Sequence, residues 1–524
     1  MARKLSAVWI LQAELVVTSP LAVGGLGQAG ELVIARDGAG RPYVPGSSLA
    51  GCLRSLTARA LDTKGLRGQL RDGQDKAQAQ TVTDQLFGYS TRQGDGGLAS
   101  PLRVMDAPID GARLGRRDGV AIDRWAGAAA DNLLFSREVI EPGATLPLWV
   151  EVEVPDTEIK GSTSEGLAAQ SSTIDALMPA LAAVLKEQGL TVGAAGSRGL
   201  GRLRVDNLRL LRLDLSQRAQ LALWWKTRAN PTLPEPLPPE LLRAPEGVAL
   251  GEEQRFTFRV HWHPLGPILV KSGQEGPDIR QMPLTVRCVD GQYRAALPGS
   301  SIRGALRSHA ERIIRSIRPF EEPISDKFLE QIQVEVVSEL FGRARSRSEG
   351  PAKERALARG ALTVLDCLHR QALATPPLGL TDEHGRSEDA PEGWQVRSRI
   401  AVDRFTGGAL DSALFKVMEP AWEPRGAALW EPITLTVDLH RLASGTDTKL
   451  PALAMGLLSL LLRDLAEGEL PLGFGTRQGM GRVVVTRVEA VGAGLAVNDI
   501  LAEDEGWSAK LNEWEEEWQT FARV

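Results

Sequence analysis

The stretch Pro-Gly-Ser-Ser-Leu-Ala-Gly-Cys-Leu-Arg at residues 45–54 occurs a second time, as Pro-Gly-Ser-Ser-Ile-Arg-Gly-Ala-Leu-Arg at residues 298–307. In each copy Pro-Gly predicts a turn, and paired serines are residues that favour helix N-caps. Apolar residues then recur at helical spacing, so each copy predicts a strand, a turn and a helix start. Free N–H groups and hydroxyls at such a start can bind a phosphate, and the alternative is a capped core helix alone.

Four further landmarks follow each copy in the same order. They are Leu-Phe-Gly (86–88 and 340–342), a strand ending at Asp106 or Asp366, Asp-Arg before a glycine (123–127 and 403–407), and a Gly-rich loop (193–202 and 473–482). The five separations are 253, 254, 260, 280 and 280 residues. This ordered recurrence predicts a tandem duplication.

The repeat and a Pro-rich stretch give the domain organisation that we predict. It comprises a first domain (1–228), a linker (229–250), a second domain (251–495) and a C-terminal amphipathic helix (496–524).

Composition restricts the function classes. The chain has 524 residues, is 43% hydrophobic and 24% charged, and carries a net charge of −5, so nucleic acid would need a local basic groove. Three scattered cysteines indicate a reducing, cytoplasmic setting, and no apolar run is long enough to predict a membrane span. All six histidines lie at or after residue 261, in the second predicted domain, which excludes a histidine acid–base pair within the first domain.

These motifs resemble the RAMP superfamily of CRISPR-associated proteins, and more narrowly the backbone subunits of type III effector complexes. Two such domains in one chain resemble the double backbone subunit of the subtype D variant. The resemblance implies an α+β fold of two tandem ferredoxin-like (RRM-like) RAMP domains, each with a β-hairpin thumb. It also implies three kinds of partner, namely a guide CRISPR RNA, a complementary target RNA and other CRISPR effector subunits, with no membrane.

A guide must be held by its phosphates and 2′-hydroxyls so that its bases stay free. The serines, the Gly-rich loops and nearby cations suit this task. The RNA-binding residues that we predict are Ser47, Ser48, Arg54, Arg124, Arg198, Arg202, Lys271, Ser300, Ser301, Arg303, Arg307, Arg404, Arg477 and Arg482. For each arginine the alternative is a solvated or ion-paired side chain.

Some family members cleave target RNA with an aspartate near the thumb, which predicts Asp123 and Asp403 as catalytic residues with a divalent cation, Mg²⁺. Other members carry the acid in the loop before the Pro-Gly-Ser-Ser strand, where this chain offers Glu31 and Asp278. An Asp beside an Arg is also a common structural ion pair. We therefore expect a guide-binding subunit that cleaves target RNA; the rivals are a non-catalytic scaffold and a guide-processing endoribonuclease. Asp106 and Asp366 are predicted as turn formers.

Overall fold

The computed structural model describes residues 4–26, 32–60, 82–90, 97–156, 164–235, 255–273, 279–317, 328–342, 359–373, 394–420, 429–443, 448–502 and 504–523. The chain forms two compact units. Unit 1 contains Met1–Gly115, Glu138–Ala194 and Gly201–Glu253, and unit 2 contains Arg116–Arg137, Ala195–Leu200 and Gln254–Val524. Two pieces of the first sequence repeat therefore belong to unit 2. The domain bounds predicted from the repeat stay a prediction.

Unit 1 is built on one antiparallel sheet in the order β12-β13-β1-β11-β7. Its main elements are β1 (Leu5–Val17), α1 (Gly46–Ala60), β7 (Leu102–Val104), β11 (Thr145–Pro155), α4 (Ser164–Gln188), β12 (Leu190–Thr191) and β13 (Arg202–Asp214). Smaller elements are β2 (Gly24–Leu26), β3 (Leu32–Ile34), β4 (Tyr43–Val44), α3 (Val82–Phe87), β5 (Tyr89–Ser90), β6 (Gly97–Leu98), β8 (Ala107–Pro108) and α5 (Arg218–Ala229). Without β12, the chain runs β-α-β-β-α-β through this sheet.

Both faces of β1 are buried, which explains its nearly continuous apolar sequence. Trp9 and Leu11 belong to the cluster that contains residues of α1 and α4. Val8 and Ile10 on the opposite face belong to a second cluster with Trp224 of α5. A strand that alternates between two apolar layers cannot shift register by one residue without exchanging both sets, so β1 fixes the registers of β11 and β13.

Unit 2 repeats this plan with the sheet order β18-β22-β14-β23-β24. Its main elements are β14 (Arg255–Pro264), α6 (Gly299–Ile317), β18 (Leu362–Val364), β22 (Ile433–Asp438), α11 (Leu450–Ala466), β23 (Val483–Gly492) and β24 (Leu495–Val497). Smaller elements are η2 (Gly196–Arg198), β15 (Ile279–Gln281), β16 (Thr285–Arg287), β17 (Tyr293–Leu297), α7 (Phe328–Gln331), α8 (Val337–Phe341), β19 (Cys367–Leu368), α10 (Leu439–Ala443), η4 (Thr476–Gln478) and α12 (Glu505–Arg523). Strands β14, β18, β22 and β23 hold the same relative places as β1, β7, β11 and β13.

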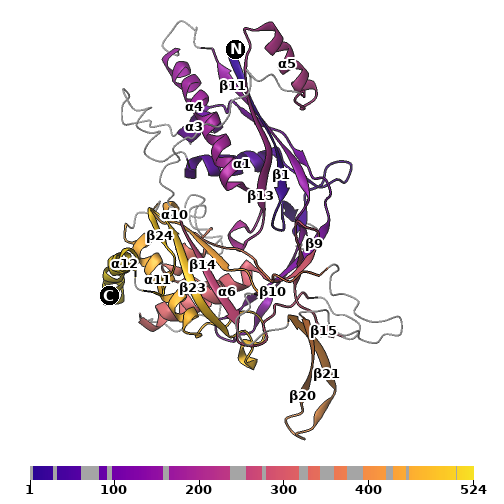
Figure 1. Cartoon of the computed structure of the whole chain (residues 1–524), viewed down its shortest axis with the longest axis vertical. Helices are drawn as coiled ribbons and strands as arrows, with labels where there is room; N and C mark the ends of the chain where they lie inside the picture. Colours follow the sequence, from indigo (N-terminus) through magenta and orange to yellow (C-terminus); the bar gives the residue numbers. More distant parts are fainter. Residues whose placement is uncertain are drawn as a thin grey trace. The chain divides into compact units, whose positions relative to one another are not determined.

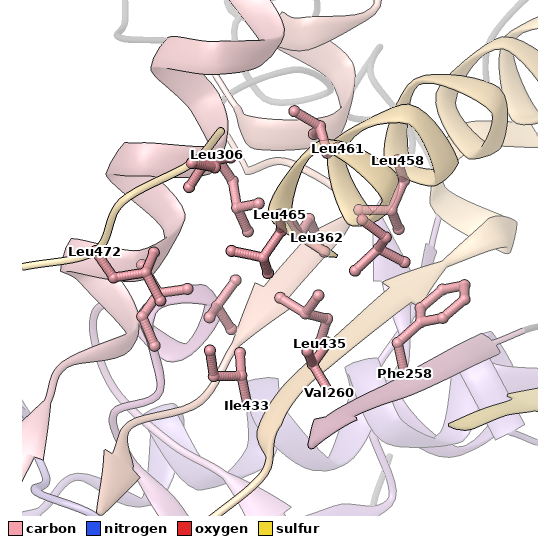
Figure 2. Packing of buried hydrophobic residues seen from close by; sticks show 14 of the residues in the cluster. Phe258, Val260, Leu306, Leu362, Ile433, Leu435, Leu458, Leu461, Leu465 and Leu472 are labelled. Atoms are coloured by element: carbon pink, nitrogen blue, oxygen red, sulfur yellow. The ribbon is translucent and has the colours of Figure 1, made fainter. Parts of the chain in front are cut away.

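The core of unit 2 lies between this sheet and its helices. Figure 2 shows Leu306 of α6 and Leu458 and Leu465 of α11 gathered in one cluster with Phe258 and Val260 of β14. The C-terminal helix α12 adds Trp507, whose ring packs edge-on against Phe258. The amphipathic helix expected from the spacing of the C-terminal tryptophans is thus present, and it completes this core.

Each repeat also carries a long β-hairpin. We call β9 (Leu114–Ile122) with β10 (Ala129–Ile140) the first hairpin, and β20 (Trp394–Val402) with β21 (Ala409–Pro420) the second hairpin. Figure 1 shows the second hairpin extending from the rest of unit 2. Residues 116–137 of the first hairpin belong to unit 2 as well. The predicted α+β class is confirmed by these mixed helices and sheets.

Candidate nucleic-acid interface

The helix starts of the two motif copies have the same geometry. The Gly46 N–H donates to Asp106 Oδ1 at 2.7 Å, and the Gly299 N–H donates to Asp366 Oδ1 at 2.8 Å. A Cβ at Gly46 would lie 2.4 Å from the Val104 carbonyl oxygen. Glycine is needed because the helix start presses against the end of the neighbouring strand.

The prediction that the serines cap these helices is wrong. Helix α1 begins at Gly46 and α6 at Gly299, so both serine pairs lie inside the first turn, with Ser47 and Ser300 exposed. Each helix is capped by a carboxylate that lies just after the following strand, Asp106 after β7 and Asp366 after β18. The sequence did not reveal this role. Phosphate binding by the serines stays a prediction.

The last arginine of the motif differs between the copies. Arg54 forms an exposed ion pair with Asp84 of α3 at 2.8 Å. Arg307 is largely buried and donates to Glu311 at 2.8 Å and to two backbone carbonyls of the segment 328–342. Arg307 therefore joins α6 to that segment, which favours a structural role.

Arg303, one turn earlier on α6, is 7% exposed and donates to the Phe341 carbonyl. Its Nε has no hydrogen-bond partner among the described residues. Burial lowers the pKa of its guanidinium to about 9, and the charges of Arg198, Arg307 and Arg359 contribute to this decrease. Because arginine keeps its proton in proteins, this lowered pKa means that the charge of Arg303 lies in unfavourable surroundings, which an anion nearby would improve.

Two more arginines lie close enough to interact with these charges, namely Arg198, which is exposed, and Arg137, which is half-buried. Desolvation lowers the pKa of Arg198 in the Gly-rich loop, as does the charge of Arg307. Desolvation and the charge of Arg198 lower the pKa of Arg137 on the first hairpin, and Arg137 Nε also has no partner among the described residues. We call Arg117, Arg124, Arg137, Arg198, Arg303 and Arg307 the arginine cluster; all six belong to unit 2.

Two carboxylates compensate part of the cluster. Asp366 pairs with Arg117 at 2.8 Å, and Glu311 pairs with both Arg124, at 2.6 Å, and Arg307. Within the part of the chain that the structure describes, no carboxylate forms an ion pair with the other three members, Arg137, Arg198 and Arg303. Positive charges that lie close together in partly dehydrated surroundings attract an anion. Phosphate is suited to them because a planar guanidinium can donate two parallel hydrogen bonds to its oxygens.

The tips of the two hairpins are nearly identical. Asp123 Oδ1 accepts hydrogen bonds from the Trp125 and Ala126 N–H groups, both at 2.8 Å. Asp403 Oδ1 likewise accepts from the N–H groups of Phe405 and Thr406, at 2.8 and 2.7 Å. These backbone hydrogen bonds hold the pKa of each carboxyl below its ordinary value. The geometry favours a turn-forming role, and the catalytic role of both aspartates stays a prediction.

The tips do not offer a complete cation site. Within the described ranges, no three His, Cys, Asp or Glu side chains group together in a way that could hold a metal ion. At each tip one carboxylate oxygen is occupied by two backbone donors. The residues present therefore do not fit Mg²⁺, and the alternative acids Glu31 and Asp278 lie outside the described residues.

The hairpins instead expose apolar side chains at matched positions 280 residues apart. Trp125 is 80% exposed and Phe405 is 99% exposed. Other exposed apolar residues are Val120, Ile122 and Leu134 on the first hairpin, and Ile400, Val402 and Leu414 on the second. Isolated exposed aromatics at two hairpin tips are suited to stacking on a planar partner.

The remaining predicted RNA-binding residues are dispersed. Arg202 begins β13 in unit 1, and its carbonyl accepts from the Thr18 N–H. In unit 2, Lys271 lies 3.9 Å above the Phe474 ring, and Arg477 lies beside Gly127 of the first hairpin. Arg482 is exposed next to β23, and Arg404 is exposed at the second tip.

Sequence reasoning missed Arg117, Arg137, Glu311 and Gln331. Arg117 and Asp366 are 249 positions apart, and Gln331 lies outside every repeated motif. No local pattern could have joined them. Only the difference between the repeats could have drawn attention to Arg137. Its counterpart 280 residues later is Val417, so the first hairpin carries a charge that the second lacks at this position.

A model of the RAMP superfamily matches residues 14–204 and 281–484, once in each repeat. The chain belongs to the RAMP superfamily. The double match supports a tandem RAMP protein, and it connects the chain with CRISPR systems and RNA binding. A search of curated proteins finds no match for this RAMP chain. Among the described residues, no helix is long and apolar enough to cross a membrane.

Proposed function

We propose that this chain is the double backbone subunit of a type III CRISPR ribonucleoprotein, most like the subtype D variant. Each repeat acts as one ferredoxin-like RAMP domain with a hairpin thumb. Support for this fold comes from the β-α-β-β-α-β order and the matched strand order of the two sheets. The chain binds the guide CRISPR RNA and assembles with target RNA and with other effector subunits.

The arginine cluster is the observation that carries this proposal. The helix α6, the Gly-rich loop and the first hairpin each supply a guanidinium whose pKa is lowered by burial and by its neighbours. A backbone phosphate placed beside these guanidinium groups relieves their mutual repulsion. Contacts with phosphates do not depend on the base sequence, and a protein that binds many different guides needs this property.

The test is binding of two unrelated, fluorescently labelled single-stranded RNAs, followed by anisotropy. The double variant Arg137→Ala/Arg198→Ala is expected to weaken both RNAs equally, by about tenfold. The slope of the logarithm of the RNA association constant against the logarithm of the salt concentration should also become less steep. The change is roughly 0.7 for each phosphate that the protein no longer neutralises.

Arg204→Ala is the matched control, since Arg204 is exposed and pairs with Asp206 on its own strand, at 2.8 Å in unit 1. The proposal fails if the double variant binds like this control. It also fails if one RNA sequence loses far more affinity than the other.

Target cleavage is a second part of the proposal, and it is directed to Glu31 and Asp278 before the tip aspartates. The reason is that the Asp123 and Asp403 carboxylates already close the hairpin turns. In the assembled ribonucleoprotein with Mg²⁺, Glu31→Ala and Asp278→Ala should each remove one cleavage band, whereas Asp123→Ala and Asp403→Ala should not. If Asp123→Ala and Asp403→Ala remove the bands instead, the aspartates at the hairpin tips are the catalytic residues. If all four variants give unchanged bands, the chain is a non-catalytic scaffold. Cation-independent cuts in precursor RNA would indicate a guide-processing enzyme.

A further inference from the structure

The helix α5 is attached to the sheet of unit 1 by one of its sides. Trp224, which is 7% exposed, packs in the cluster that contains Val8 and Ile10 of β1. The guanidinium of Arg228 lies 4.9 Å from the centre of a Trp224 ring, and its Nε lies 3.8 Å from Oε1 of the buried Glu151. These contacts fix which side of α5 faces the sheet and which side faces solvent.

The side of α5 that faces solvent carries an aromatic ring between two alanines. Trp225 is 68% exposed, although it directly follows the buried Trp224. Ala222 and Ala229 stand three residues before it and four residues after it, so they lie on the same side of the helix, and both are exposed. Because alanine side chains are short, a planar group can approach the indole ring along this side. Among the described tryptophans, only Trp125 at the first tip is more exposed.

The charge of α5 is entirely positive. Its sequence contains three cations and no aspartate or glutamate. Arg218 and Lys226 are exposed, and neither forms an ion pair or a side-chain hydrogen bond within the part of the chain that the structure describes. The helix dipole favours a cation in the last turn, where Lys226 lies, but disfavours one in the first turn, where Arg218 lies. Helix stability therefore does not explain the position of Arg218.

We propose that this solvent-facing side of α5, made of Arg218, Ala222, Trp225 and Lys226, is a second binding site for single-stranded RNA. We call it the α5 surface. One base stacks on the indole ring of Trp225, and neighbouring phosphates contact Arg218 and Lys226. Every base has a π face, so this binding does not depend on sequence. The inference rests on the proposed function, because the ligand is RNA, but its residues are separate from the arginine cluster, which belongs to unit 2.

A protein is the less suitable occupant of the α5 surface. A stable protein interface buries about 800 Å² on each partner and is centred on a group of packed anchor residues. The α5 surface offers one large apolar side chain, Trp225, between short alanines and unpaired cations. A single nucleic-acid strand combines planar bases with anionic phosphates, and it complements both features of this surface.

Photo-crosslinking of the full chain to single-stranded RNA tests the inference. The RNA contains 5-iodouridine, which forms a covalent bond on irradiation with an aromatic side chain stacked against it, and mass spectrometry locates the bond. We expect a crosslink at Trp225, in the tryptic peptide 219–226. Trp225→Ala should reduce the yield of this peptide adduct at least tenfold, whereas Trp225→Phe should retain it because a ring remains.

Fluorescence anisotropy with two unrelated RNAs measures the contribution to affinity. Trp225→Ala should weaken both RNAs about fivefold to tenfold, since stacking of one base on an exposed ring contributes at the lower end of the usual range. Trp225→Phe should stay within about threefold of the unmodified chain. Arg218→Ala/Lys226→Ala should weaken both RNAs and make the salt dependence less steep, and Arg204→Ala serves again as the control with an exposed, paired arginine.

The inference is overturned if RNA binds but no crosslink forms at Trp225, or if Trp225→Ala binds RNA like the control. It is also overturned if Trp225→Ala lowers the melting temperature of the free chain as much as Trp224→Ala does, because the indole ring would then pack against another segment of the protein. Failure of the proposed function gives a different result: Arg137→Ala/Arg198→Ala binds RNA like the control, while the crosslink at Trp225 persists.

Discussion

The two copies of the motif align over ten residues, seven of them identical, yet their terminal arginines serve different purposes. On α1, Arg54 lies at the surface of unit 1, and its carboxylate partner Asp84 is also partly exposed. On α6, Arg307 is surrounded by Glu311 and by the carbonyls of Ile332 and Gly342. A repeated motif therefore specifies where a helix begins, while residues outside the motif decide whether its arginine forms an exposed ion pair or a buried structural one.

The difference arises from Glu311, whose counterpart is Ala58. A buried carboxylate is stable only when it is paired, and Glu311 obtains two guanidinium partners, Arg124 and Arg307. The acid thus allows the second repeat to accept the tip of the first hairpin. The first repeat has alanine at this position, and α1 contains no aspartate or glutamate that could take the place of Glu311.

The largest expected effect is on the stability of unit 2. Arg307→Ala should lower its free energy of unfolding by about 3–5 kcal/mol, because Glu311 would lose a partner in a nearly water-free position. Arg54→Ala should lower that of unit 1 by only about 0.2–1 kcal/mol, as exposed ion pairs contribute little. Urea denaturation with hydrogen exchange of peptides from each unit measures both values. Equal losses would mean that the two arginines have equivalent surroundings.

A smaller difference is expected between the capping aspartates. Asp106→Ala removes the acceptor of the Gly46 N–H and should cost unit 1 about 1 kcal/mol. Asp366→Ala removes the same cap from α6 and also leaves Arg117, whose side chain is 12% exposed, without its carboxylate. We expect a loss of about 2–4 kcal/mol in unit 2.

Arg117→Met in the Asp366→Ala background is the control for this comparison. Removing the orphaned charge should recover part of the lost stability, leaving the cap alone. If Arg117→Met restores no stability to unit 2, the Arg117–Asp366 ion pair contributes nothing. Asp106 and Asp366 would then stabilise their units equally, through the helix caps alone.

The duplication and the α+β class could be predicted because both depend on local patterns. The Pro-Gly turn, the apolar spacing after residues 49 and 302, and the Gly-rich loops each act within about ten residues. The same locality explains the error over the serine caps. Ser47 and Ser48 suit an N-cap, but Asp106, distant in sequence, reaches the first helical N–H.

The candidate site was predictable only in part, because its charge balance is a tertiary property. Arg198 and Arg303 were named from their motifs, and the structure brings them together in unit 2. Whether Arg124 or Arg307 can bind RNA depends on Glu311 and on the segment 328–342, which no motif marks. Sequence motifs identify the candidate charged residues, but the tertiary packing determines which of them form ion pairs.

The smallest expected effect compares the two hairpin tips. Gly127 and Gly407 both have positive φ, 62° and 70°, so alanine at either position should cost about 1–2 kcal/mol of local backbone strain. No atom lies within 4 Å of a Cβ at Gly407, whereas at Gly127 the Cβ would lie 2.2 Å from Arg477 Nη2. Gly127→Ala must therefore also displace the flexible end of Arg477, and hydrogen exchange of peptides at the tip should show slightly faster opening than for Gly407→Ala. Arg477→Ala combined with Gly127→Ala should remove that excess, because only strain then remains. If peptides at the first tip still exchange faster in the double variant, the difference between the tips lies in their backbone and not in the contact of Gly127 with Arg477.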